Sequence, residues 1–228
     1  MVTAWITSAS IMKMAHVVEL SRAKSRHWRF MLVSFILFWG AAPAPATTVV
    51  PPTFSELVNE SDYIVRAVVK SVTSEWRGAP GQGSIFTRVE LEVREVIAGA
   101  PPQPLVLEML GGKVGDQEMA IQGAPRFSVG QEDILFVQGN GKNVYPLFAI
   151  MHGRYPIRKE AGTGREYMTR SNEVPMQDVD EVALPMAEGP AAEIQRRMKN
   201  PAQALTPAQL VQRVKAAVNP GYRRVRQR

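Results

Sequence analysis

The sequence predicts a mainly β fold, a small barrel or sandwich with a short helix at each end of the domain. Residues 85–93 alternate strictly between apolar and polar side chains, which is typical of a strand with one buried face. Further short apolar runs follow at regular spacing, separated by glycine-rich turns, as in small all-β domains. The 228 residues include no cysteine, so a hydrophobic core and not disulfides must hold the fold.

The first 46 residues have the order of a cleavable export signal. An apolar run from Phe30 to Trp39 precedes the small residues Ala44-Pro45-Ala46, and four basic residues stand before it: Arg22, Lys24, Arg26 and Arg29. The run is shorter than the roughly 20 apolar residues that cross a bilayer. We expect cleavage after Ala46, which leaves Thr47 first and no membrane span in the processed chain.

An uncleaved signal anchor is the alternative, and its basic flank would also place the domain outside the cytoplasm. Exported domains without disulfides fit a bacterial envelope better than an animal extracellular space. We therefore expect a periplasmic or secreted protein.

The charge of the chain is concentrated at its two ends. The sequence has a pI of about 9.8, 27 basic and 21 acidic residues. Five basic residues and one acidic residue lie in 1–46, and four basic residues lie in the last eight positions, which leaves 18 basic against 20 acidic between 47 and 220. A nucleic-acid-binding domain would carry its basic residues on the fold itself. The sequence therefore predicts no nucleic-acid partner.

The processed chain begins with a linker, 47–53, and a short helix. Thr53 and Glu56 have the spacing of a capping box, which predicts a helix over 54–58. The barrel domain is expected over 54–170. Its first strand, 63–72, carries apolar residues on both faces and so predicts a buried strand.

The remaining predicted strands follow in order, with a glycine-containing loop, 74–84, after the first. Glycine and asparagine residues at 139–143 predict a hairpin connector. The expected strands are 63–72, 85–93, 105–110, 118–122, 133–138, 144–150, 154–158 and 166–169.

The C-terminal part is predicted to contain an irregular, proline-rich segment, 171–205, with a short helix over 191–198. The last segment, 206–228, is expected to form a helix and a basic tail. Thr206 and Gln209 make a second capping box, with Pro207 in the first helical position. Its apolar stripe, expected to pack on the chain's own barrel, comprises Leu210, Val211, Val214 and Val218.

The first half of the domain resembles a known family. The matching stretches are Phe54-Ser55-Glu56-Leu57, Ser61 to Val69, and, after a loop, 85–93 and Val96-Ile97-Ala98-Gly99. They are similar to the N-terminal domain of the tissue inhibitors of metalloproteinases and to netrin-like modules, over roughly residues 54–110. The resemblance implies an OB-fold-like closed barrel. The chain also resembles uncharacterised exported bacterial proteins, through Gly111-Gly112, 123–132 and Leu135-Phe136.

The inhibitory chemistry of that family does not carry over to this chain. In the inhibitors, an N-terminal cysteine presents its amine and carbonyl groups to the protease zinc. This chain has no cysteine, and its expected first residue is Thr47 on an unanchored lead. A terminus that is not preorganised binds metal weakly. The resemblance therefore implies the fold and not zinc chelation.

The candidate catalytic groups favour ordinary structural roles. His152 is the only histidine after Ala46, which excludes a three-histidine or HExxH zinc site, and no nucleophile elbow accompanies it. We expect it to be a hydrogen-bonded loop residue beside Gly153. Glu90 and Glu92 share one strand face and fit salt bridging better than glycoside hydrolysis. Residues 111–115 lack the spacing of a phosphate loop and fit a turn. The sequence thus predicts a non-enzyme without catalytic residues, cofactor or metal.

Three residues are candidates for ligand contact. OB-type barrels bind through loops and one strand face, and Trp76, Phe86 and Arg88 could form such a patch. Alternatively, the last helix covers Phe86. The sequence predicts a non-catalytic module that binds a protein or polymer in the envelope or extracellular space. A protease inhibitor that acts through barrel loops is the alternative, and a hydrolase is the third hypothesis.

Overall fold

The computed structural model describes residues 50–79 and 83–219. The expected export signal, the start of the linker and the basic tail from residue 220 lie outside the described residues. All described residues belong to one compact unit, 49–228. No helix within the described ranges is both long and apolar enough to cross a bilayer.

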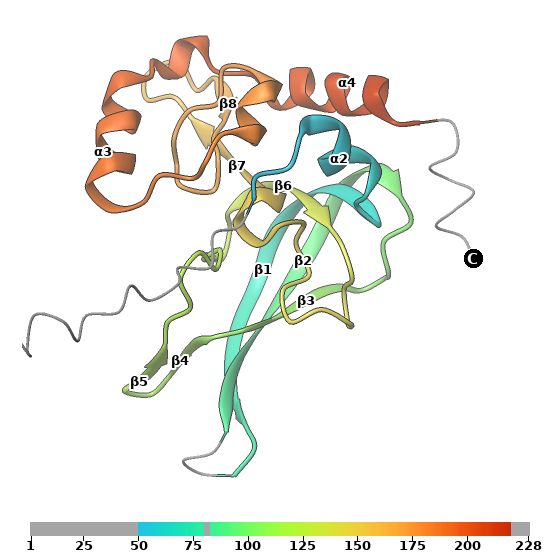
Figure 1. Ribbon diagram of the computed structural model, residues 1–228, viewed down its shortest axis with the longest axis vertical. Helices are drawn as coiled ribbons and strands as arrows, with labels where there is room; N and C mark the ends of the chain where they lie inside the picture. Colours follow the sequence, from blue (N-terminus) through green and yellow to red (C-terminus); the bar gives the residue numbers. More distant parts are fainter. Residues whose placement is uncertain (1–49, 80–82, 220–228) are drawn as a thin grey trace, which may run out of the picture. The chain divides into compact units, whose positions relative to one another are not determined.

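Six antiparallel strands form the main sheet in the order β3-β2-β1-β6-β7-β8, which confirms the mainly β prediction (Figure 1). The strands are β1 (Tyr63–Arg77), β2 (Ser84–Gly99), β3 (Leu105–Leu110), β6 (Glu132–Val137), β7 (Arg154–Lys159) and β8 (Glu166–Met168). A separate ribbon pairs β4 (Gly112–Val114) with β5 (Gln117–Met119). Because β3 and β8 are the two edges of the sheet order, closure into a barrel is not confirmed.

The hairpin of β1 and β2 is longer than the sequence predicts. Residues 74–77 and 84 of the expected loop are strand, since pairing continues from Ser71↔Glu90 to Arg77↔Ser84 without a register shift. Polar residues occupy this extension, and their side chains form hydrogen bonds to residues of neighbouring strands. The Ser74 and Thr87 hydroxyl oxygens lie 2.8 Å apart, and Arg77 makes hydrogen bonds of 2.5 and 2.6 Å to the Glu108 carboxylate.

Both predicted capping boxes are present. α2 (Phe54–Asn59) begins where the Glu56 N–H donates to the Thr53 hydroxyl (3.3 Å) and the Thr53 N–H donates to the Glu56 carboxylate (2.8 Å). α4 (Pro207–Ala217) begins with the same reciprocal bonds between Thr206 and Gln209. The remaining helices are α3 (Gly189–Met198) and the 3-10 helices η1 (Ile150–Gly153), η2 (Val179–Ala183) and η3 (Pro201–Gln203).

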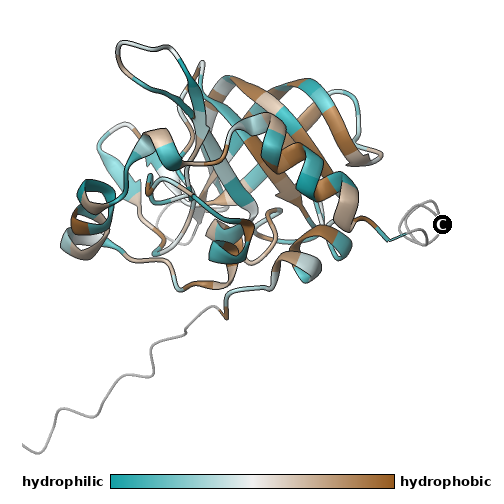
Figure 2. Cartoon of the chain, turned by 90° about the horizontal axis from the view of Figure 1, so that it is seen from above, coloured by the Kyte–Doolittle hydropathy of each residue, from teal (hydrophilic) through white to brown (hydrophobic). Residues whose placement is uncertain are grey.

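The two faces of the central strands contribute to two separate cores. On one face, Ile64 of β1 packs with residues of α2, β6, β7 and α4 in what we call the helix-side core. On the other face, Val65 and Ala67 pack with residues of β2, β3 and β6 in the inner core. Figure 2 shows apolar residues concentrated on these strands and on part of the helix that precedes the marked C-terminus.

α4 packs against its own domain, as predicted. Leu210 and Val214 are fully buried in the helix-side core, and Val218 is partly buried against it. Lys215 on the same helix makes a 2.8 Å ion pair with Glu95 of β2.

The prediction of a regular strand over 144–150 is wrong. Only the single bridge Val137↔Leu147 forms there, and the chain then enters η1. Pro146 has no N–H to donate to a ladder, and Ala149 has a positive φ of 45°, which ends an extended conformation. The segment still makes backbone bonds on both sides. The Phe148 N–H donates to the Phe136 carbonyl (2.9 Å), and the Leu110 N–H donates to the Val144 carbonyl (3.4 Å).

Candidate functional site

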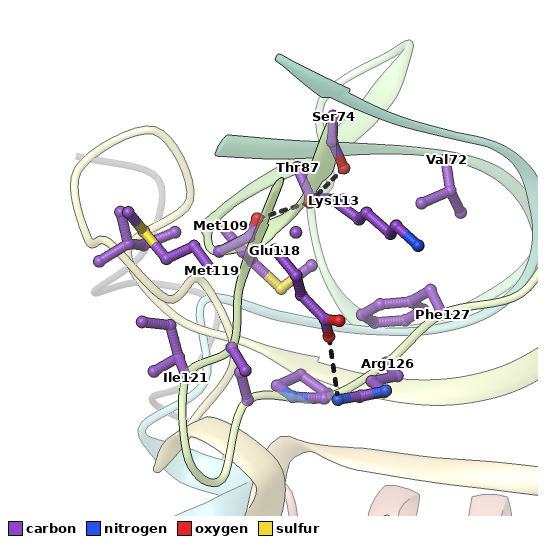
Figure 3. Close-up of a pocket in the computed structure, with 16 residues that line it drawn as sticks. Val72, Ser74, Thr87, Met109, Lys113, Glu118, Met119, Ile121, Arg126 and Phe127 are labelled. Atoms are coloured by element: carbon purple, nitrogen blue, oxygen red, sulfur yellow. Dashed lines mark hydrogen bonds and ion pairs between the residues drawn. The ribbon is translucent and has the colours of Figure 1, made fainter. Parts of the chain in front are cut away.

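A cavity of about 320 Å³ opens where the β1–β2 hairpin, the end of β3, the β4–β5 ribbon and the segment 120–127 meet (Figure 3). Its volume lies at the lower end of the range for small-ligand sites, roughly 300–1,000 Å³. Buried Met109 belongs both to the lining of the cavity and to the inner core. The cavity is therefore an opening at one end of that core.

The floor of the cavity is a short chain of hydrogen bonds. The Thr87 hydroxyl donates to the Gly111 carbonyl at 2.6 Å, which commits its proton. The 2.8 Å contact between the Ser74 and Thr87 hydroxyl oxygens must then have Ser74 as the donor. Both hydroxyl protons of the floor are thus used within the protein.

Gly112 lies directly above these hydroxyl groups. Its φ of +136° is a conformation that residues with a side chain rarely adopt. A Cβ at this position would lie 2.2 Å from Thr87 Oγ1 and 2.6 Å from Ser74 Oγ. Glycine at 112 therefore allows the backbone to pass from β3 into β4 while it lies against the Thr87 and Ser74 hydroxyl groups.

Apolar side chains form most of the cavity walls. They come from β1, β3, β5 and the segment that follows β5, and include five large side chains: Val72, Met109, Met119, Ile121 and Phe127. Two of the five are methionines, whose flexible thioethers adapt to ligands of different shapes.

Three charged residues line the cavity: Lys113, Glu118 and Arg126. Lys113 and Glu118 are direct cross-strand partners in the β4–β5 ribbon. The Glu118 carboxylate nevertheless contacts Arg126 at 3.6 Å. Within residues 50–79 and 83–219, the Lys113 ammonium has no recorded ion pair or hydrogen bond, and Figure 3 shows it extending between Val72 and Phe127.

A buried ion pair supports the Phe127 wall. The Arg154 guanidinium lies 4.8 Å from the ring centroid of Phe127 and makes hydrogen bonds of 3.2 and 3.3 Å to Asp133. Both charged side chains are almost completely buried. Burial raises the pKa of Asp133, and the positive charge of Arg154 opposes that rise.

The three predicted contact residues do not form one patch. Trp76 lies in β1 and pairs with Ile85, so these two side chains share a face of the hairpin, and Trp76 remains 39% exposed. Phe86 follows Ile85 and therefore points to the opposite face, as does Arg88. The guanidinium of Arg77 covers Phe86 with its carbon 5.0 Å from the ring centroid. None of the three lines the cavity.

The residues that line the cavity are not apparent from the sequence. The turn predicted over 111–115 is wrong, because Gly112–Val114 is strand β4 and the turn begins only at Gly115. The glycine signal also does not indicate that Lys113 and Arg126 approach the same space. That proximity depends on the local β4–β5 pairing and on the Arg154–Phe127 contact, which joins segments distant in sequence.

His152 is buried and is not the loop residue that the sequence predicts. It lies in η1, and its imidazole ring forms a hydrogen bond with the backbone of Val182. The Nδ1 atom of the ring has no hydrogen-bond partner among the described residues. Burial, with a contribution from the charge of Arg170, lowers the pKa of His152 to about 4.

The acidic pair on β2 stays at the strand surface. Glu92 makes a 2.6 Å ion pair with Arg94, and Glu90 accepts a 3.3 Å hydrogen bond from Ser71. The described part of the chain contains no group of three or more histidine, aspartate or glutamate side chains arranged to hold a metal ion.

The cavity can therefore accommodate an apolar group and place a cation beside it, with the hydroxyl protons of its floor already engaged. Comparison of the chain with protein-family models finds no match, and comparison with curated proteins finds no similar sequence.

Proposed function

We propose that this protein is an exported, non-catalytic binding module that holds a protein or polymer of the cell envelope at the cavity beside the β4–β5 ribbon. The observation that carries the proposal is the cavity itself, about 320 Å³ in volume, with apolar walls and a lysine that has no ion-pair partner within residues 50–79 and 83–219. Such a combination suits recognition of a ligand, since apolar contact gives affinity and a few polar groups give orientation.

The export signal supports the cellular part of the proposal. Basic residues, an apolar run and Ala44-Pro45-Ala46 occur in the order that signal peptidases recognise. The partner is accordingly sought in the periplasm or the extracellular space.

The resemblance to netrin-like modules supports an OB-fold-like barrel as the finer description of the fold. In that description, the irregular segment 144–148 lies between β6 and β3 and links them by single backbone bonds. Its bonds to Phe136 of β6 and Leu110 of β3 favour this arrangement. The cavity would then lie at one mouth of the barrel, where barrels commonly bind ligands.

Photo-crosslinking in cells tests the proposed function. A photoreactive benzoylphenylalanine replaces Met119 at the cavity, and a control variant carries it at exposed Lys159 of β7. We expect an adduct of the full chain with one envelope component from position 119 and none from position 159. Equal labelling from both positions, or no adduct from position 119, would contradict the proposal.

A protease inhibitor is the second candidate, because the β1–β2 hairpin extends beyond β6. β6 pairs with β1 only as far as Val68, whereas β1–β2 pairing continues to Arg77. Exposed Trp76 lies on this extension. If the hairpin inhibits a protease, replacing Trp76 by alanine should weaken inhibition of a captured protease, whereas Lys113→Gln at the cavity should not.

A further inference from the structure

We propose that the cavity recognises an apolar group that carries a single carboxylate, a statement that rests on the proposed binding function and specifies its ligand. The proposal stands on three features of the cavity: the size of its apolar interior, the imbalance of charge at its rim, and a floor that has no hydroxyl proton left to offer.

The interior favours a compact hydrocarbon group. A volume of about 320 Å³ with methionine, isoleucine, valine and phenylalanine walls admits a short alkyl chain or one large apolar side chain. Transfer of each methylene group from water into such a site contributes about 0.8 kcal/mol. A chain of several carbons therefore gives measurable affinity without any specific polar contact.

The rim favours a negative charge. Lys113 and Arg126 supply two positive charges against the one negative charge of Glu118. Glu118 lies 3.6 Å from Arg126, and the Lys113 ammonium has no recorded anionic partner among the described residues. Lys113 is exposed, so a carboxylate placed between Val72 and Phe127 would meet this ammonium with apolar walls on one side and water on the other. The walls would shield the ion pair only in part.

The floor disfavours a second acidic end on the ligand. The Thr87 proton goes to the Gly111 carbonyl and the Ser74 proton goes to Thr87. The Gly111 N–H is also engaged, since it donates to the Ile85 carbonyl at 2.7 Å. The hydroxyl oxygens of the floor can still accept a hydrogen bond, but they have no proton to donate. A carboxylate driven to the floor would therefore lose its bonds to water without equivalent replacement. The geometry points to a ligand with its carboxylate at the rim only.

Titration of the full chain with octanoate and, separately, with octanol tests the proposal. The readout is the NMR signal of the methionine methyl groups, because Met109 and Met119 line the cavity. We expect octanoate to shift these two signals and to bind about five- to tenfold more tightly than octanol, as one partly shielded ion pair allows. Equal affinities for octanoate and octanol would overturn the proposal that the cavity recognises a carboxylate, and would show that only apolar contact drives binding.

Substitution of Lys113 tests whether its positive charge causes the preference for a carboxylate. Lys113→Gln should weaken octanoate binding about fivefold or more and leave octanol binding unchanged. Lys142→Gln is the matched control, because Lys142 is also exposed but does not line the cavity. Octanoate affinity that is unchanged in Lys113→Gln, or that falls equally in both variants, would overturn the proposal.

An apolar group with one carboxylate occurs both in fatty acids and at the C-terminus of polypeptides. The methyl signals of Met109 and Met119 distinguish these two sources. A free fatty acid is represented by octanoate, and the end of a polypeptide by a short peptide with C-terminal leucine, compared as free acid and as amide. Preference for the peptide acid over its amide assigns the site to a chain terminus, as a protein partner requires. Binding of octanoate alone assigns it to a fatty acid and would overturn the protein or polymer partner proposed above. If none of these acids moves the Met109 and Met119 signals, the ligand class is wrong, whereas the crosslinking experiment judges the binding function independently.

Discussion

The guanidinium of Arg154 lies between the ring of Phe127, 4.8 Å away, and the carboxylate of Asp133, which it contacts at 3.2 Å. The contact joins a wall of the cavity to the start of β6. Because Phe127 belongs to a segment without regular structure, this buried arginine fixes the position of the wall.

Replacement of Arg154 by methionine should lower the free energy of unfolding by about 3–5 kcal/mol, because Asp133 would be left buried without its countercharge. Urea unfolding followed by circular dichroism measures the loss. The double variant Asp133→Leu, Arg154→Met removes both charges and should recover part of the stability. If the double variant is less stable than Arg154→Met alone, the buried Asp133 charge is not the cause.

Gly112→Ala should destabilise the domain by about 3 kcal/mol or more, through its positive φ and through contact of the new methyl group with Thr87 and Ser74. Gly115→Ala is the control, since Gly115 also has a positive φ, +59°, but has open space around it. The control should lose only about 1 kcal/mol. Equal losses by chemical denaturation would show that backbone conformation, and not the floor of the cavity, requires Gly112.

Acidification should destabilise the fold through His152. Its pKa is lowered from an ordinary value of 6.5 to about 4 by burial. Below pH 6.5 the unfolded chain therefore binds a proton that the folded chain does not, and stability falls as the pH decreases to about 4. The loss should not exceed about 3 kcal/mol.

Thermal unfolding of the wild-type protein and of His152→Asn between pH 7.5 and 4.5 measures this effect. The variant should have a lower melting temperature at pH 7.5 if packing suffers, but a flatter dependence on pH. A dependence as steep as that of the wild type would assign the acid sensitivity to other groups.

Export should produce a chain that begins at Thr47. Removal of 46 of the 228 residues leaves 182, a difference that intact-mass measurement resolves easily. Ala46→Leu places a bulky residue next to the expected cleavage site and should cause the unprocessed chain to accumulate, whereas Ala42→Leu should be processed normally. Full-length protein in the membrane fraction of wild-type cells would favour the signal-anchor alternative.

Local patterns were sufficient to predict much of the fold. The two capping boxes, the alternating strand from Ile85 and the buried stripe of α4 all depend on residues a few positions apart, and each is present. The extension of β1 to Arg77 was missed, because loop-forming residues there are held by cross-strand bonds to Glu108 and Thr87. Local propensity cannot indicate such long-range compensation.

The candidate site was the least predictable part. Trp76 and Phe86 are ten residues apart, and their separation onto opposite faces depends on the hairpin register. Lys113 carried no signal in the sequence, because its position at the cavity depends on the β4–β5 ribbon and on a wall fixed by Arg154.

The alternation of β1 between two cores has a consequence for cooperativity. Ile64 and Val65 are neighbours in the chain, yet each anchors a different core, so neither core can melt without disrupting the strand that the other requires. Heating should accordingly give one calorimetric transition for the strands of the main sheet and the C-terminal helix together. Removal of α4 would then weaken the cavity at the far end of the sheet without altering any residue that lines it.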